Sequence, residues 1–600
     1  MLLPYSKAYR QQKHKVGWSL LSLAWCLLLL LSACDANNQN STNNTNNNAA
    51  RPTQLVPGAS VPCSSHSTNP VTLTMAYGSE KQAWIEDVVK DFNSHNYAAC
   101  DGAITVNATP MGSGQSMQQI TDGSLQPDIW SPAGGVWLTL LNAQWQEKHN
   151  ATLVGTGAND TPSLVSSPVV IAMWKPQAEA LGWPGKAIGW ADIARLSTDP
   201  QGWKAYGHPE FGQFKFGHTH PDYSNSGLDA IIAMNYAATN KVRGLTNDDV
   251  NNATTKNFVA NVESSVIHYG DSTGFFADKM FSKGPSYLSA TVMYESLVIE
   301  ANSGKKYPNL PFPVVAVYPK EGTFYSDHPF AILQGSWVTP ARKAAALAFR
   351  SFLLASAQQS KALQYGFRPS DVNMKLAAPI DSAHGVDPAQ PSTTLQIPNA
   401  DTIRAIQSSW NQQKRRVDVM LVLDRSGSMN DPIGGTTKIE GAKQGLKEFV
   451  NLLDDQDGLS FTVFSDDENV VSPVSPLGPK RQKLLSQISN VVADGNTKLL
   501  DTIASQANTI NKLPSNHIKA VVVLTDGIDN RSSTQLDQLV KQVSASGENA
   551  GTATKIFTIA YGSDADVNAL KQIATATGAQ EYSGNPQNIK QVYTQISEFF

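Results

Sequence analysis

Long apolar runs are scarce in this chain of 600 residues. One run, at 16–31, follows the basic residues Lys7, Arg10, Lys13 and Lys15, and no second long run comes after it. An excess of charge of one sign is also missing, because 46 Lys and Arg face 50 Asp and Glu. The basic residues beyond the first run are scattered and do not form the basic patch that is typical of a nucleic-acid-binding protein. The sequence therefore predicts an exported protein that is soluble apart from its N-terminus.

Cysteine is rare as well, with four residues in the whole chain. Cys26 lies inside the first apolar run, and Cys34 ends it in the sequence Leu-Ser-Ala-Cys. That ending resembles the lipobox of bacterial lipoproteins, which implies cleavage before Cys34 and attachment of lipid to its sulfur. The alternative is an ordinary secretory signal or an uncleaved anchor. After Cys34 comes an Asn- and Thr-rich stretch with too few apolar side chains to form a core, so we expect a disordered tether.

Two cysteines, Cys63 and Cys100, remain beyond the export segment. In an oxidising extracytoplasmic space they most simply form one disulfide bond. Two buried free thiols are the alternative, since sequence provides no distance between them. No cysteine spacing indicates a metal site.

Familiar catalytic motifs are also lacking: neither a phosphate-binding loop ending in Gly-Lys-Ser nor His-Glu-x-x-His occurs. Ser272 lies in a Gly-x-Ser-x-Gly pattern typical of a hydrolase, but a plain turn before a helix fits the same residues. His208, His218 and His220 suggest a zinc site, although no acidic ligand is placed beside them. We therefore expect that the protein is not an enzyme.

The clearest motif lies in the last third of the chain. Asp424, Ser426 and Ser428 follow an apolar strand at alternate positions, and Thr497 and Asp526 lie in later loops. Four apolar runs, at 417–423, 459–464, 520–524 and 555–560, alternate with helical patterns such as 438–453. That alternation predicts a doubly wound α/β sheet, whose loops meet at the carboxyl ends of the strands. Carboxylate and hydroxyl oxygens at one edge are suitable ligands for a hard divalent cation.

The region from about 416 to 600 resembles a von Willebrand factor type A domain, in which Asp-x-Ser-x-Ser, a Thr and an Asp form a metal-ion-dependent adhesion site. The resemblance implies Mg²⁺ or Mn²⁺ held mainly by Ser426, Ser428 and Thr497, with Asp424 and Asp526 contributing directly or through water. It also implies a partner protein that offers Asp or Glu to the open coordination position. A domain that keeps these residues without using the ion is the alternative.

The middle of the chain alternates strands and helices with different loop chemistry. Strands at 71–76 and 104–108 each open through a Gly-Ser turn onto a helix, a geometry that lets backbone N–H groups face a bound anion. Further polar turns follow at 127–132 and 224–228. Segments 167–175 and 312–320 are expected to carry the chain between two lobes.

This order of segments resembles the extracellular solute-binding proteins of ABC transporters, which have the two-lobed type II periplasmic-binding fold. The resemblance implies a cleft between the lobes lined by Ser79, Ser113, Ser226 and Tyr294, with an anionic group as ligand. The alternative for each serine is a helix N-cap, which uses the same geometry. Trp130 could stack on a ligand, but a core position is the commoner role.

The expected order of domains is a signal peptide at 1–33, a tether at 34–67, a solute-binding domain at 68–385, a linker at 386–413 containing a short helix near 402–412, and a von Willebrand factor type A domain at 414–600. We expect a lipid-anchored protein on the extracytoplasmic face of the cell membrane. It would combine solute binding, with an ABC permease as a partner, and metal-dependent protein binding. The alternative is an adhesin, sensor or surface assembly protein whose solute-binding fold no longer serves transport.

Overall fold

The computed structural model describes residues 54–63, 66–157, 159–270, 272–513, 517–544 and 554–597. The expected signal peptide, Cys34 and most of the expected tether lie outside the described residues. Within those ranges, no helix is both long and apolar enough to cross a membrane. The described chain contains three large β-sheets, two before residue 370 and one after residue 416.

The first lobe is built on a mixed six-stranded sheet. Its strand order is β1 (Gln54–Leu55), β3 (Tyr97–Ala99), β4 (Gly102–Met111), β2 (Val71–Gly78), β5 (Ile129–Ser131) and β12 (Ala331–Ile332). Its helices are α1 (Gln82–Ser94), α2 (Ser113–Asp122), α3 (Val136–His149), α11 (Pro340–Leu354) and α12 (Ser356–Gln364). Strand β2 lies between the parallel neighbours β4 and β5. Leu73, Met75 and Tyr77 alternate along β2 and share one apolar cluster with α1 and α11.

The second lobe has a sheet of seven strands. The main order is β10 (Val314–Val317), β6 (Val165–Trp174), β9 (Ala290–Tyr294), β7 (Phe216–Thr219) and β8 (Val266–Gly270), and β11 (Tyr325–Ser326) and β13 (Arg368–Pro369) also pair with β6. Its helices are α4 (Lys175–Ala180), α5 (Trp190–Thr198), α6 (Asn225–Thr239), α7 (Asn247–Asn251), α8 (Ala253–Glu263), α9 (Thr273–Lys283) and α10 (Glu295–Asn302).

The path of the chain confirms a two-lobed domain, but one expected crossing is placed differently. Strand β6 does carry the chain into the second lobe. The segment 312–320, in contrast, forms β10 at the edge of the second sheet, paired antiparallel with β6. The return to the first lobe comes later, at β12, which pairs with β5. Sequence patterns identify β10 as a strand but do not say which sheet it joins.

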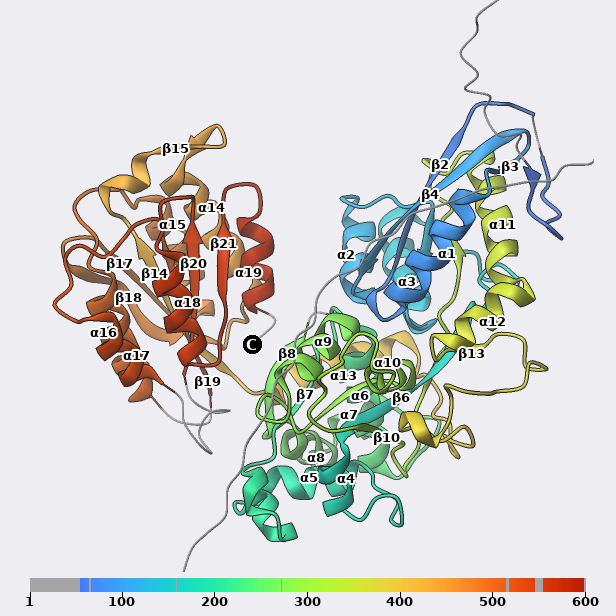
Figure 1. The fold of residues 1–600 in the computed structure, drawn as a ribbon, viewed down its shortest axis with the longest axis horizontal. Helices are drawn as coiled ribbons and strands as arrows, with labels where there is room; N and C mark the ends of the chain where they lie inside the picture. Colours follow the sequence, from blue (N-terminus) through green and yellow to red (C-terminus); the bar gives the residue numbers. More distant parts are fainter. Residues whose placement is uncertain are drawn as a thin grey trace, which may run out of the picture. The chain divides into compact units, whose positions relative to one another are not determined.

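The C-terminal domain has a six-stranded, mostly parallel sheet (Figure 1). Its order is β18 (Glu468–Pro476), β17 (Gly458–Phe464), β14 (Val417–Asp424), β19 (Ile518–Thr525), β20 (Lys555–Tyr561) and β21 (Glu581–Gly584). Its helices are α14 (Lys438–Leu452), α15 (Arg481–Ser489), α16 (Leu499–Asn511), α17 (Leu536–Val543), α18 (Val567–Ala576) and α19 (Ile589–Ser597). Among the strands described in this domain's sheet, β18 alone runs antiparallel to its neighbour, β17.

Both faces of this sheet are covered, as the sequence predicts for a doubly wound fold. All eight residues of β14 are buried. Met420 and Val422 pack into an apolar cluster with residues of α16, α17 and α18, whereas Leu421 and Leu423 belong to the cluster that includes residues of α14, α15 and α19. A strand buried on both faces explains the uninterrupted apolar run in the sequence. Loops at its carboxyl end are left free to carry function.

The helix expected near 402–412 is α13 (Ala400–Gln413). It packs against α6, α7 and α8 of the second lobe. Ile403, Ile406 and Trp410 are buried, and the indole N–H of Trp410 donates to Glu263 at 2.9 Å. The second half of the expected linker is therefore a packed helix.

Candidate functional site

The metal-type motif lies where β14 ends at the edge of its sheet. Asp424 is fully buried, and its carboxylate accepts hydrogen bonds from the backbone N–H of Ser426 at 2.7 Å and the hydroxyl of Thr525 at 2.5 Å. The hydroxyl oxygens of Ser426 and Ser428 lie 3.1 Å apart. Burial raises the pKa of Asp424 to about 6, against the opposing hydrogen bonds. The carboxylate thus supports a turn that presents two hydroxyl groups.

The loop that carries Thr497 is held between its neighbours by backbone contacts. The N–H of Gly427 donates to the carbonyl of Gly495 at 2.9 Å. The N–H of Thr497 donates to the side chain of Asn530 at 2.9 Å, and the N–H of Asn530 returns a bond to the carbonyl of Thr497 at 3.1 Å. Three loops from separate parts of the domain are therefore fixed to one another.

Asp526 closes the group directly after β19. Its carboxylate is fully buried and accepts from the Ser428 hydroxyl at 2.9 Å and from the Lys438 ammonium at 2.8 Å. Lys438, the first residue of α14, also donates to Asp564 at 2.9 Å. Although burial lowers the pKa of Lys438, its bonds to the two carboxylates raise it overall.

The oxygen atoms that these loops bring together suit a cation. A methyl group at Gly527 would lie 3.2 Å from the Thr497 hydroxyl and 3.9 Å from the Ser428 hydroxyl, so both oxygens face the same small volume. The donors around it are hydroxyl and carboxylate oxygens, which suit Mg²⁺ or Mn²⁺. The structure thus brings together all five residues predicted from the sequence, and their role as metal ligands stays a prediction.

In the two-lobed part, the lobes meet through backbone and side-chain contacts at the starts of helices. The N–H groups of Gly114 and Gln115, at the start of α2, donate to the carbonyl of Tyr223 at 2.9 and 3.1 Å. The N–H of Gly274, at the start of α9, donates to the Ser79 hydroxyl at 3.1 Å. The Gly-Ser turns therefore lie at the contact between the lobes, and their role in binding an anion stays a prediction.

The four predicted cleft residues are all buried, and each has a partner within the protein. The Ser113 hydroxyl accepts from the N–H of Ala133 at 3.0 Å. The Ser226 hydroxyl lies 2.9 Å from the hydroxyls of Thr219 and Thr273. The Tyr294 hydroxyl accepts from the Asn225 amide at 3.1 Å, and Ser79 accepts from Gly274 as above. Their role as ligand contacts stays a prediction.

A buried charged cluster at the same place was missed by sequence reasoning. The Lys81 ammonium donates to Glu80 at 2.8 Å, and the Nδ1 atom of His328 lies 3.3 Å from both groups. Burial would raise the pKa of Glu80, but Lys81 and His328 lower it to about 2. Burial and the Lys81 charge lower the pKa of His328 to about 4. No sequence signal joins His328 to a turn 247 residues earlier.

Several buried polar atoms of the described residues have no hydrogen-bond partner within the protein, and three of them belong to this region. They are the hydroxyls of Ser131 and Ser272 and the Nε2 atom of His328. Ser131 ends β5 and its carbonyl accepts from Lys81 at 3.2 Å, while Ser272 is the N-cap of α9. Buried polar groups are normally paired, so these three atoms could accept or donate hydrogen bonds to a bound solute.

Trp130, His208 and His218, the other candidates from the sequence, have partners within the protein. Trp130 is fully buried, and its indole N–H donates to Ser116 at 2.9 Å. His218 is buried against Glu263, whereas His208 pairs with Glu210 at the surface. Among the residues that the structure describes, no three His, Cys, Asp or Glu side chains are grouped to hold a metal ion.

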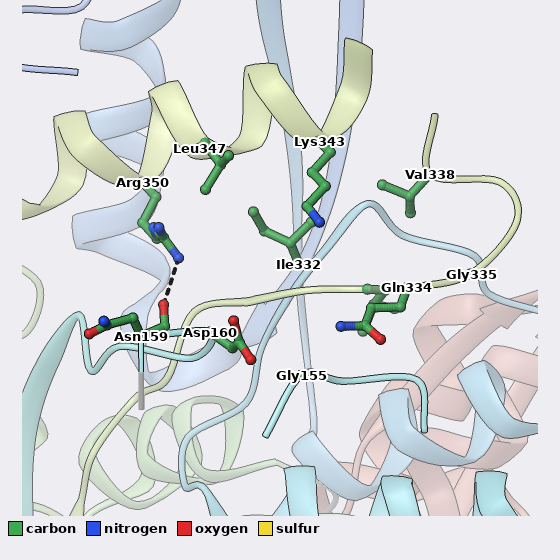
Figure 2. Close-up of a pocket in the computed structure, with 11 residues that line it drawn as sticks. Gly155, Asn159, Asp160, Ile332, Gln334, Gly335, Val338, Lys343, Leu347 and Arg350 are labelled. Atoms are coloured by element: carbon green, nitrogen blue, oxygen red, sulfur yellow. Dashed lines mark hydrogen bonds between the residues drawn. The ribbon is translucent and has the colours of Figure 1, made fainter. Parts of the chain in front are cut away.

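A separate cavity of about 640 Å³ lies in the first lobe, between α11 and the loops near residues 155–160 and 332–338. Figure 2 shows Lys343 and Arg350 on α11 facing Gln334 and Asp160 across it. Arg350 donates to the carbonyl of Asn159 at 3.1 Å. The cavity is lined by charges of both signs and has no clear chemical preference.

The expected disulfide is confirmed: Cys63 and Cys100 are bonded, with a sequence separation of 37. The bond joins the segment before β2 to the turn between β3 and β4.

Two family models match parts of the chain. Residues 73–368 match the bacterial extracellular solute-binding protein, and residues 418–597 match the von Willebrand factor type A domain. No curated protein matches the chain.

Solved structures are similar to each part at low identity. A von Willebrand factor type A structure from Catenulispora acidiphila is 21% identical, covers 31% of this chain and 42% of its own, and has a TM-score of 0.27. A periplasmic thiamin binding protein is 14% identical, covers 59% of this chain and 99% of its own, and has a TM-score of 0.42. The periplasmic binding protein AfuA from Actinobacillus pleuropneumoniae, with fructose-6-phosphate bound, is also 14% identical, covers 58% and 99%, and has a TM-score of 0.40.

Proposed function

This chain joins a bacterial extracellular solute-binding domain to a von Willebrand factor type A domain. We propose that it is an anchored extracytoplasmic protein with two binding functions. The first domain binds a small solute, and the second binds a protein partner through a metal ion. Both are binding folds, and the proposal includes no enzymatic reaction. The expected boundary at 414–600 and the lipid on Cys34 are parts of this proposal, as is a solute-binding domain that extends beyond the expected end at 385 to include α13.

The convergence of the Ser428 and Thr497 hydroxyls beside Asp526 is the observation that carries the metal-dependent half. Ser426, Ser428 and Thr497 would hold Mg²⁺ or Mn²⁺, with Asp424 and Asp526 supporting them. Such an ion, when bound, attracts a carboxylate from a second protein. The face around the site is suited to a protein, because the apolar side chains of Val492 and Ile528 are 71% and 62% exposed.

The solute-binding half is supported by the unpaired hydroxyls of Ser131 and Ser272 and by the Nε2 atom of His328. The charges nearby are already compensated, because Lys81 is paired with Glu80. A small polar solute, neutral or with an anionic group bound by hydroxyls and N–H groups, satisfies these atoms. In the first of two proposed roles, the protein delivers this solute to an ABC permease. The alternative is an adhesin, sensor or assembly protein that has lost transport.

Metal binding tests the C-terminal half. The full-length chain in detergent, titrated with Mn²⁺, is expected to bind one ion that Mg²⁺ displaces, and Ser428→Ala is expected to weaken binding at least tenfold, about 1.4 kcal/mol. Thr509→Ala is the matched control, because Thr509 is an exposed residue whose hydroxyl bonds only within α16. Equal Mn²⁺ binding by the wild type and Ser428→Ala would show that the metal does not bind at the proposed site.

Tryptophan fluorescence tests the solute-binding half, because all 12 tryptophans lie at or before Trp410. Thermal unfolding is read in the presence of inorganic phosphate, sulfate, single amino acids or monosaccharides. One class is expected to raise the unfolding temperature, as mass action requires of a ligand, and Ser272→Ala is expected to abolish the shift. Ser408→Ala, an exposed change on α13, is the control. If no probe acts while Mn²⁺ binding persists, the adhesin or sensor alternative is favoured.

A further inference from the structure

The ammonium group of Lys438 is built into the metal-type site. Its side chain is 5% exposed and lies 2.8 Å from the Asp526 carboxylate, which is fully buried. The two oxygens of Asp526 are thereby divided, one accepting from Lys438 and the other from the Ser428 hydroxyl. A monovalent cation of the protein itself already compensates the carboxylate next to which a divalent ion would bind.

The position of Lys438 is set by the backbone on several sides. Its own N–H donates to the carbonyl of Asp431 at 3.0 Å, at the base of the short β15–β16 hairpin (Pro432–Ile433 and Thr436–Thr437). Its ammonium also bonds to Asp564, and the Asp431 carboxylate lies 3.9 Å away. A methyl group at Gly562 would lie 3.3 Å from Cε of Lys438, and φ there is +92°, so glycine leaves room for the lysine.

Removal of this ammonium has two effects on metal binding, and both act in the same direction. A positive charge held on Asp526 repels a divalent ion beside it, and this repulsion is strong at a site shielded from water. Without Lys438, Asp526 becomes a buried charge with no compensating partner, which destabilises the metal-free domain. A bound divalent ion then restores the compensation.

We propose that Lys438 is a resident counter-cation that weakens metal binding at this site and keeps the metal-free domain stable. This inference deepens the proposed function and rests on it, since it concerns regulation of the same metal site. The ammonium and the divalent ion share Asp526, so the affinity for the ion is lower than the oxygen ligands alone would produce. Association with an acidic partner then requires a higher concentration of metal.

Lys438→Met in the full-length chain is the main test, with Mn²⁺ alone as the probe and free Mn²⁺ measured by electron paramagnetic resonance. We expect the Kd for Mn²⁺ to fall about tenfold or more. We also expect the unfolding temperature of the metal-free variant to fall and Mn²⁺ to raise it more than in the wild type. Lys438→Gln, which keeps a hydrogen-bond donor without the charge, is expected to do the same and decides the matter if Lys438→Met does not fold.

Lys443→Met is the matched control on the same helix. Lys443 is also largely buried, but it pairs with Glu440 at 2.7 Å and has no contact with Asp526. The Kd of the Lys443→Met variant for Mn²⁺ is expected to equal that of the wild type. A Kd that is unchanged or higher in both Lys438 variants, while the wild type binds Mn²⁺, overturns this inference alone. A wild type that binds no Mn²⁺ overturns the proposed metal site, and this inference with it.

Discussion

Gly274 and Ser79 lie 195 residues apart in the chain and join the two lobes through a 3.1 Å hydrogen bond from the N–H of Gly274 to the Ser79 hydroxyl. The contact is close enough to exclude a side chain at Gly274. A Cβ atom there would lie 2.7 Å from the Ser79 carbonyl oxygen. Lobe contact at this point therefore depends on glycine.

Gly274→Val is expected to hold the lobes apart at this contact. The amide hydrogens at the start of α9 should then exchange at least about tenfold faster, because a protected N–H becomes exposed. Hydrogen exchange read by mass spectrometry measures this in the full chain. Gly185→Ala is the control, since the nearest atom to a Cβ there is 3.7 Å away. Unchanged exchange in Gly274→Val would mean that the lobes are already apart in solution.

Asp229 provides a pH-dependent prediction for the solute-binding part. It is 3% exposed and accepts from the Asn225 amide at 2.6 Å. Burial raises its pKa to about 8, with a further contribution from Asp327. The folded state therefore keeps a proton between about pH 4 and 8 that the unfolded chain loses, so stability falls as pH rises through this window.

The measurement is urea unfolding followed by tryptophan fluorescence at pH 5 and pH 7. The wild type is expected to lose up to about 1.4 kcal/mol of stability per pH unit relative to Asp229→Asn, which cannot exchange this proton. The comparison removes the effects of other groups, including the opposite effect of His328, whose pKa is lowered to about 4 in the folded state. Parallel pH profiles for the two proteins would contradict a protonated Asp229.

Helix α13 leads to a prediction about the domain boundary. Ile406 on α13 is fully buried against the second lobe. Ile406→Ala should lower the stability read by tryptophan fluorescence by about 2–5 kcal/mol, because it leaves a cavity in a packed core. Ser408→Ala, on the exposed side of the same helix, should change it by less than about 0.5 kcal/mol. If Ile406→Ala leaves the unfolding transition unchanged, α13 does not pack on the second lobe. It would then belong to a free linker, as the expected domain boundary at 385 implies.

Much of the C-terminal domain could be predicted because its signals are local. Residues 417–423 read as a buried strand, and β14 is buried along its whole length. Asp424, Ser426 and Ser428 follow this strand, and Thr497 and Asp526 in later loops complete the motif. The solute-binding part was harder, since β10 reads as a strand whichever sheet it joins. The serines predicted to line its cleft were recognised as polar turn residues, but their partners in the structure, such as Ala133 for Ser113, come from distant loops.

By itself, the sequence determined several of the strands and helices, that the two cysteines beyond the export segment were available to pair, and that Asp424, Ser426, Ser428 and Asp526 follow apolar strands while Thr497 lies in a polar loop before a helix. These properties depend on periodicity and on the fixed geometry of an α/β sheet. The tertiary structure alone decided which charges meet. Lys438 lies 88 residues before Asp526, and Lys81 lies 247 residues before His328. An exposed lysine needs no partner, whereas a buried one must have an opposite charge or several acceptors, and only the packing of distant loops determines where that burial occurs.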